Sequence, residues 1–255
     1  MRSVVRRAAI HVILVLTGVL ACDAPVDPQW PHEPSGYTVI SDMPFTAAFP
    51  AGSSDQPYTD GWGITGYNRP QMLVTRVSDA TAPLSSPWVA QFSYPIGYTD
   101  GTEPGDIYRT LDASSLYAGF WWKPSNPWQS NSSGTNKICF INVGPSMLLS
   151  MHPDGASWRL QFQNYYNVNA NINLDPNVTT THITLGAWHH IEILALSGGT
   201  IKVWIDGVLN ISYGGQAMPA SFSQFELAPT WGGNTGESKT EQDYYWYDDV
   251  HLSVP

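Results

Sequence analysis

Apolar and polar residues alternate with a period of two along much of the chain after residue 36. The clearest stretch is 188–210, where β-branched residues form one face: Ile191, Ile193, Ile201, Val203 and Ile205. Gly198-Gly199 interrupts this alternation, and Asp206-Gly207 follows it. Alternation broken by short glycine-containing turns predicts antiparallel pairing. We therefore expect a β-hairpin here, followed by a second tight turn.

Other segments repeat this pattern. Further strands are predicted at 37–49, 62–64, 71–77, 88–94, 116–123, 137–143, 158–165 and 244–254. Residues 95–114 are rich in Gly, Pro, Asp and Thr, which is typical of loops. Helical periodicity and internal repeats are not apparent after residue 21.

The alternation also assigns faces to the strands. Side chains of successive strand residues point to opposite faces, so every second residue faces the core. The residues predicted to point inward are Leu116, Ala118, Phe120, Trp122, Ile138, Phe140, Trp158, Leu160 and Phe162. Lys137, Cys139 and Ile141 are expected on the opposite face of their strand, and Cys139 is expected to be inert.

Two stretches resemble a known superfamily. Trp188-His189-His190 with the W-x-D-G end of the hairpin, and YWYDDV at 245–250, are similar to laminin-G-like domains. These belong to the concanavalin A-like lectin/glucanase superfamily, which also has a polysaccharide-lyase-like branch. The resemblance implies an all-β fold, a two-sheet antiparallel jelly-roll sandwich over residues 37–255. It also implies a glycan cleft on the concave sheet.

The N-terminus predicts export. Arg2, Arg6 and Arg7 precede an apolar run at 8–20 that suits a secretory signal peptide better than a membrane span. The run ends in Val19-Leu20-Ala21-Cys22, which resembles a bacterial lipobox. We expect cleavage after residue 21 and lipidation of Cys22, which anchors a protein to a membrane without spanning it. This predicts a location in the bacterial cell envelope, on the periplasmic or extracellular side.

A proline-rich segment and an acidic composition follow. Prolines at 25, 28, 31 and 34 predict a stiff, extended tether over residues 22–36. The chain has a formal net charge of −10, and loss of the three arginines of the signal peptide lowers it to −13. Such a field repels nucleic acid, so no nucleic-acid partner is expected.

The outward-facing positions of three strands supply the candidate glycan site. If these strands are neighbours, one surface carries Tyr117, Trp121, Lys123, Lys137, Arg159, Gln161, Gln163 and Tyr165. Aromatic faces stack on sugar C–H groups, while amide and guanidinium groups bind hydroxyls and carboxylates. An ordinary solvated sheet is the alternative.

Catalytic and metal sites have weaker support. The E-x-D-x-E strand of the superfamily's glycosidases is absent, as are the R-x-E-L-R-like and Q-I-H-like strands of alginate lyases. His189 and His190 point to opposite faces of a strand and cannot chelate one ion together. Asp248 and Asp249 could contribute to a calcium site but are too few oxygen ligands for a convincing one, so no cofactor or metal is expected and calcium is the weakly supported alternative.

These observations favour noncatalytic carbohydrate binding by an envelope lipoprotein. A polysaccharide lyase acting on a uronate-containing glycan is the second interpretation. A structural subunit docked on another envelope protein is the third.

Overall fold

The computed structural model describes residues 29–52, 54–66, 72–142, 146–167 and 172–255. The predicted signal peptide, Cys22 and residues 22–28 of the expected tether lie outside this part of the chain. No helix among the described residues is long and apolar enough to cross a membrane.

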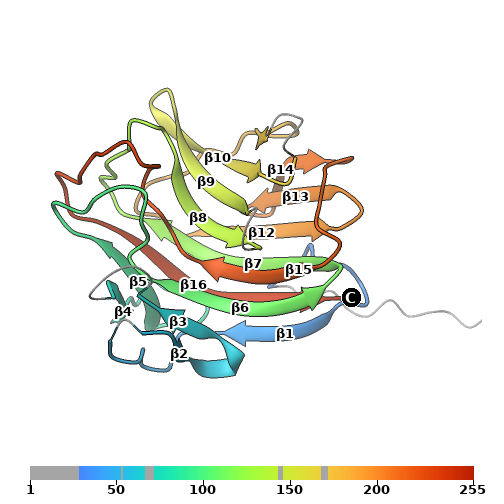
Figure 1. The fold of residues 1–255 in the computed structure, drawn as a ribbon, viewed down its shortest axis with the longest axis horizontal. Coiled ribbons are helices and arrows are strands. Elements are labelled where there is room, and N and C mark those ends of the chain that lie inside the picture. Colours follow the sequence, from blue (N-terminus) through green and yellow to red (C-terminus); the bar gives the residue numbers. More distant parts are fainter. Residues whose placement is uncertain (1–28, 53, 67–71, 143–145, 168–171) are drawn as a thin grey trace, which may run out of the picture.

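Two antiparallel sheets form the structure (Figure 1). The strands of sheet A are, in spatial order, β14 (Val208–Tyr213), β13 (Thr200–Ile205), β12 (His189–Leu196), β7 (Ser115–Pro124), β16 (Asp243–Val254), β5 (Trp88–Tyr94) and β4 (Val74–Ser78), with β1 (Thr38–Met43) also paired to β16. Those of sheet B are β11 (Asn173–Leu174), β10 (Ser157–Asn164), β9 (Met147–Asp154), β8 (Asn136–Ile141), β15 (Phe222–Leu227), β6 (Asp106–Ala113), β3 (Gly63–Thr65) and β2 (Gln56–Pro57). A single 3₁₀ turn, η1 (Thr59–Gly61), is the one helical element described. The predicted all-β jelly-roll sandwich is confirmed.

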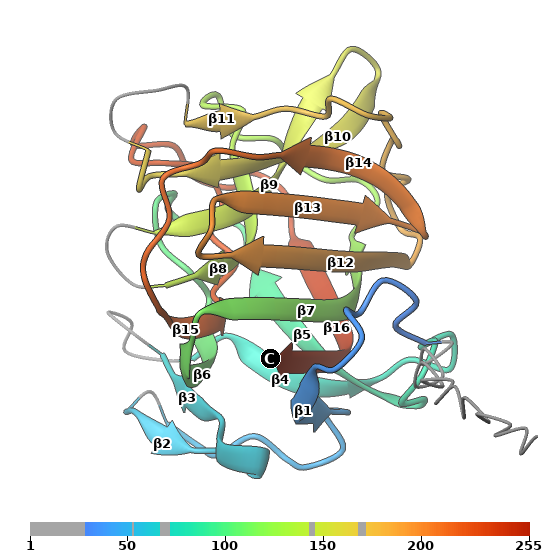
Figure 2. The ribbon, with the colours of Figure 1, turned by 90° about the vertical axis from the view of Figure 1, so that its right-hand side faces the viewer.

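The predicted hairpin is present in sheet A (Figure 2). Ile191 pairs with Ile205 and Ile193 with Val203, and Gly199 in the turn has a φ of 93°. Asp206 and Gly207 then connect β13 to β14 with φ values of 52° and 77°. Positive φ at both central residues defines a type I′ turn, which glycine and aspartate accommodate well.

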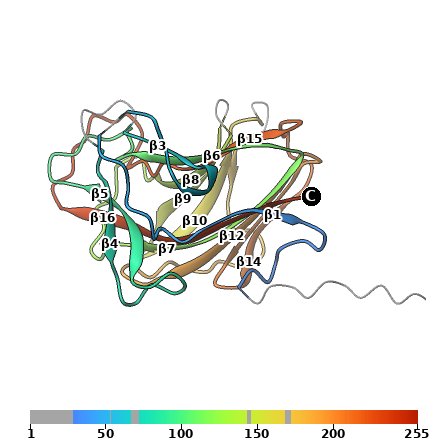
Figure 3. The same ribbon diagram turned by 90° about the horizontal axis from the view of Figure 1, so that it is seen from below.

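The core lies between the two sheets, which are seen one above the other in Figure 3. The alternating sets of β7, β10 and β13 all contribute to it, as predicted. Phe120, Phe162 and Ile205 are completely buried there. Each stabilises the sandwich mainly through removal of its apolar surface from water, about 1.5–3 kcal/mol per side chain.

The faces of β8 differ from the prediction because the strand contains a β-bulge. Its pairing with β9 shifts between Lys137 and Cys139. Ile138 is buried as expected, but Cys139 and Ile141 also join the core, while Phe140 is only partly buried on the outer side. The inward assignment of Phe140 and the outward assignments of Cys139 and Ile141 were therefore wrong. An extra residue in one strand inverts the alternation beyond it.

Two further expectations need correction. Residues 95–114 are not all loop, because β6 covers Asp106–Ala113 and lies between β3 and β15. Residues 29–36 are not an extended free tether. They form turns that pack on the outer face of sheet A, the face turned away from sheet B in Figure 3.

Trp30 anchors this N-terminal segment. Its side chain is 2% exposed and contacts Tyr117, Leu194 and Trp204. The ring stacks on His251 at a centroid distance of 5.0 Å, and His32 stacks on Trp204 at 4.7 Å. His32 also bonds the fully buried carboxylate of Glu192 through its backbone N–H (3.1 Å) and through Nδ1 (2.8 Å).

Candidate functional site on sheet B

The eight predicted glycan-binding residues lie on two different sheets. Tyr117, Trp121 and Lys123 belong to β7 in sheet A, whereas Lys137 is in β8 and Arg159, Gln161 and Gln163 are in β10 of sheet B. Tyr165 follows β10 and is 39% exposed. The condition that the three strands be neighbours is not met. Outward side chains of the two sheets face opposite sides of the sandwich, so these residues do not form one surface.

The sheet A residues have structural partners within the chain. Tyr117 is completely buried beneath the N-terminal segment and donates a hydrogen bond to Glu192. The Lys123 ammonium forms an ion pair with Asp79 and lies 4.6 Å from the ring of Trp188. Trp121 packs on His190 at 4.8 Å. These contacts hold loops and the N-terminal segment on the sheet. They account for Tyr117, Trp121 and Lys123 as structural residues, so that no ligand is needed to explain them.

On sheet B, a polar row crosses three neighbouring strands. Lys137 in β8 pairs with Ser150 in β9, and Ser150 pairs with Gln161 in β10. All three side chains point away from the core. Within the described chain Lys137 forms no ion pair, although Glu103 and Asp100 act on it from a distance. Burial lowers the pKa of Lys137, and those two carboxylates oppose the shift.

A second row places His152 beside Arg159. The Nε2 atom of His152 lies 2.8 Å from the Ser150 hydroxyl. Burial, together with the positive charge of Arg159, lowers the pKa of His152 to about 4. The imidazole is therefore neutral at physiological pH and one ring nitrogen is able to accept a proton or hydrogen bond.

Arg159 and Gln161 are oriented by Asp175, the residue that follows β11. Arg159 forms an ion pair with Asp175 at 2.5 Å, and the Gln161 amide donates to the same oxygen at 2.7 Å. Arg159 therefore contributes less free positive charge than the sequence suggested. The acceptor and donor groups of the row are held in fixed positions before any ligand binds, which reduces the entropic cost of binding.

Gln163 continues the polar face toward β11. Its amide nitrogen donates to Asn173 at 3.0 Å and to Gln161 at 3.3 Å. The side chain is 7% exposed, and its Oε1 atom has no hydrogen-bond partner in the part of the chain that the structure describes. A buried unpaired acceptor is costly, so this oxygen is an unsatisfied position beneath the polar face.

Two residues of this site, Ser150 and His152, were not predicted from the sequence. Both are in β9, whose sequence MLLSMHPD lacks a clear alternation of apolar and polar residues. Leu148 and Phe140 lie next to the row on the same outer face, because they follow the outward phase of β9 and β8. The face thus combines amides, a cation and apolar surface, as expected for a sugar-binding sheet.

The histidine and aspartate pairs have structural roles. His189 Nδ1 contacts Asp206 at 2.8 Å, whereas His190 lies on the other face against Trp30. Asp248 accepts hydrogen bonds from the backbone N–H groups of Leu84 (2.7 Å) and Ser85 (3.1 Å), next to a bulge in β16. In the described residues, no group of three or more His, Cys, Asp or Glu side chains is arranged to hold a metal ion.

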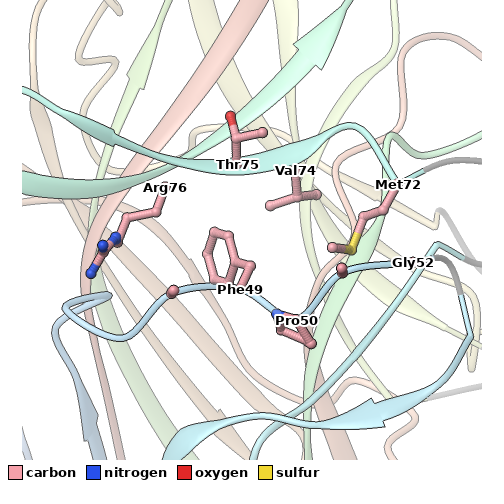
Figure 4. Close-up of a pocket in the computed structure, with 9 residues that line it drawn as sticks. Phe49, Pro50, Gly52, Met72, Val74, Thr75 and Arg76 are labelled. Carbon is pink, nitrogen blue, oxygen red and sulfur yellow. The ribbon is translucent and has the colours of Figure 1, made fainter.

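A separate pocket of about 440 Å³ lies at the edge of sheet A (Figure 4). Phe49 and Pro50 form one wall, and Val74 and Met72 form the other. Its one charged residue, Arg76, donates a hydrogen bond to the carbonyl of Thr46 and lies 4.2 Å from the Trp88 ring. The pocket contains none of the predicted site residues.

Comparison with known proteins adds information on the fold. No family model and no curated protein matches the chain. Among solved structures, a double mutant of alginate lyase Aly36B in complex with alginate tetrasaccharide matches with a TM-score of 0.57 and 12% identity, over 75% of this chain and 86% of that one.

Two other solved structures are also similar. The cellulose-induced protein Cip1 has a TM-score of 0.52 and 16% identity, over 76% and 91% of the two chains. A carbohydrate esterase of the Shiga toxin-encoding bacteriophage phi24B has a TM-score of 0.52 and 12% identity, over 86% and 99%. At these identities the similarity establishes a shared jelly-roll fold and leaves the chemistry of the site to be argued from its residues.

Proposed function

We propose that the outer face of sheet B binds a polysaccharide that carries carboxylate groups. The observation that carries this proposal is the row of Lys137, Ser150 and Gln161, in which a half-buried cation has no ion-pair partner among the described residues. A sugar carboxylate supplies that partner, and charge-assisted hydrogen bonds are the stronger class. Similarity of fold to an alginate lyase mutant in complex with alginate tetrasaccharide is consistent with this ligand class.

Calorimetry with two tetrasaccharides tests the proposal. The chain should bind alginate tetrasaccharide, which is anionic, more tightly than cellotetraose, which is neutral. Lys137→Met should weaken alginate binding by roughly ten- to a hundredfold, the equivalent of one charged hydrogen bond. Lys202→Met is the matched control, because Lys202 is equally half-buried but lies in β13 of sheet A. Equal affinity for the two sugars, or equal effects of the two variants, contradicts the proposal.

Polysaccharide lyase activity is the second candidate function. Lys137 in β8 and His152 in β9, which lies two residues from the cross-strand partner of Lys137, both have lowered pKa values. A neutral side chain of this kind is needed as the base that removes the proton next to a uronate carboxylate. A lyase forms unsaturated products that absorb in the ultraviolet. If alginate binds but absorbance does not rise on incubation with the polymer, the site binds without cleaving.

The predicted membrane anchor is a separate part of the proposed function. Lipidation of Cys22 would place the domain close to the membrane, since Gln29, the first residue that the structure describes, is seven positions along the chain from Cys22. Seven extended residues span at most about 25 Å. Intact-mass analysis of protein extracted from bacterial membranes should show cleavage before Cys22 and added acyl chains. A different mature N-terminus without acyl chains excludes the anchor.

A further inference from the structure

Two carboxyl groups lie together on the sheet B face, on the side of β8 that is away from β9 and β10. Glu226 in β15 pairs with Tyr108 in β6, and Asp106 is the next residue of β6 on the same face. This places Asp106 and Glu226 in a diagonal cross-strand relationship, about 7–8 Å apart at the backbone, and the charge of Glu226 acts on Asp106. Glu226 also pairs with Phe140 of β8, which is three residues after Lys137 and, because of the bulge, faces the same side of the sheet.

Asp106 lacks the partners expected of a buried carboxylate. Its residue is 9% exposed, and Oδ1 has no hydrogen-bond partner in the described part of the chain. Among the described residues, the charges that act on Asp106 are acidic: Glu226 on β15, Glu103 on the preceding loop, and Asp55 before β2. Asp55 accepts a hydrogen bond from the Tyr108 hydroxyl at 2.7 Å, and Glu226 accepts one from the Gln224 amide at 2.5 Å.

This combination makes ionisation of both carboxyl groups unfavourable. Burial and then the neighbouring carboxylates raise the pKa of Asp106 to about 8, and burial together with Glu103 raises the pKa of Glu226 to about 7. Lys137 interacts electrostatically with Glu103 and Asp100. Within the described residues it forms no ion pair with Asp106 or Glu226, so it does not neutralise either carboxylate. At least one proton therefore stays on the pair at neutral pH, and a protonated carboxyl donates a hydrogen bond.

We propose that Asp106 and Glu226 form a proton-retaining acid pair that donates a hydrogen bond to a carboxylate of the bound polysaccharide. This inference rests on the proposed binding of an acidic polysaccharide and identifies a second subsite for it. The polymer crosses from the Lys137 row, over Phe140, to the acid pair. Beyond the pair lies a pocket of about 330 Å³, which is lined in part by Asp55, Tyr108 and Thr110. This pocket gives the polysaccharide room to continue past Asp106 and Glu226.

The acid pair makes binding depend on pH in a specific way. A ligand carboxylate binds only while the pair keeps its proton, because two or three ionised carboxylates repel one another. Affinity for an anionic sugar should therefore be high at pH 6 and fall by up to about tenfold per pH unit once the pair ionises. Affinity for a neutral sugar should change much less over the same range.

Two measurements test this inference. Calorimetry with alginate tetrasaccharide between pH 6 and 9 should show the fall in affinity for the unmodified chain. The double variant Asp106→Asn with Glu226→Gln, which keeps amide donors but cannot ionise, should lose most of this fall and keep only the part that comes from deprotonation of Lys137. Glu241→Gln, a change at an exposed glutamate in a loop, should keep the pH dependence of the unmodified chain.

Carbon-13 NMR titration of the ligand-free full chain provides the independent readout. Two carboxyl resonances, absent from the double variant, should titrate near neutral pH. Titration of both near their ordinary value of about 4, or alginate affinity that is equal at pH 6 and 9, overturns the acid pair and leaves sugar binding intact. Absence of alginate binding at every pH overturns the acid pair together with the proposed function.

Discussion

The indole ring of Trp30 lies directly over Gly119 in β7, where a Cβ atom would overlap its six-membered ring. Gly119 pairs with Glu192 on one side and His251 on the other, so it forms the floor of a depression in the outer face of sheet A. Trp30 fills this depression. A segment that precedes the first strand is thus packed as part of the fold.

Gly119→Ala should therefore destabilise the protein by displacing Trp30. Overpacking of a filled site costs about 1–3 kcal/mol. Urea denaturation measures the loss of unfolding free energy. In a chain that already carries Trp30→Ala, Gly119→Ala should cause little further loss, because the two changes affect one contact. Gly198→Ala is the control, since a Cβ there meets no atom within 4 Å. Similar losses from both glycine changes would show that the ring does not occupy this position.

His251 should make docking of the N-terminal segment sensitive to pH. Burial lowers the pKa of His251, but hydrogen bonds to Asp42 (2.6 Å) and Glu33 (3.1 Å) outweigh this effect and raise it above the ordinary value. A histidine whose folded pKa is raised stabilises fully below about pH 6.5 and loses this contribution as pH rises through the folded value.

The comparison of His251→Gln with the unmodified chain tests this dependence. The difference in unfolding free energy between the two proteins should be larger at pH 5.5 than at pH 9. Subtraction removes the opposite contributions of His152 and His190, whose pKa values are lowered and which destabilise the fold as pH falls below about 6.5. A difference that is constant with pH contradicts a charged contact between His251 and its two carboxylates.

The buried ion pair of Lys239 and Asp243 should be essential for stability. Neither side chain is exposed, and the Lys239 ammonium lies 4.1 Å from the Trp128 ring and donates to the Gln129 carbonyl at 2.9 Å. Asp243→Asn leaves this cation buried without a counter-charge, at a cost of about 3–5 kcal/mol. Asp154→Asn, at an exposed pair with His182, should cost less than about 1 kcal/mol by the same denaturation assay.

The strands with strict alternation could be predicted from the sequence because each has one face on the core. Ile191, Val203 and Phe120 were assigned correctly for this reason. The order of strands could not be predicted, since β7 and β8 are consecutive in the chain but lie in different sheets. Strands β6, β9 and β15 were missed: residues rich in Gly and Pro precede β6, and β9 is apolar on both faces at its start.

The candidate site depended on that missing information. The polar positions of β10 were predicted correctly as outward-facing, but their neighbours come from β9 and β11 instead of β7. Asp106 and Glu226 are 120 residues apart in the chain and meet only because β6 and β15 pair. Period-two patterns indicate which face a residue occupies and contain no information about which distant strand lies beside it.

A matched pair of phenylalanines tests the bulge in β8 and the sugar-binding face together. Phe162 is completely buried in the core, whereas Phe140 lies on the outer face between Leu148 and Glu226. Phe162→Ala should lower the unfolding free energy by about 3–5 kcal/mol, while Phe140→Ala should cost clearly less.

Phe140→Ala should instead weaken alginate binding, because it removes the apolar surface that joins the Lys137 row to the acid pair. Chemical denaturation and calorimetry on the same two variants separate these effects. A large stability loss at Phe140, with unchanged sugar affinity, would mean that its ring points into the core. In that case β8 lacks the bulge between Lys137 and Cys139, and Phe140 does not lie on the sugar-binding face beside Lys137.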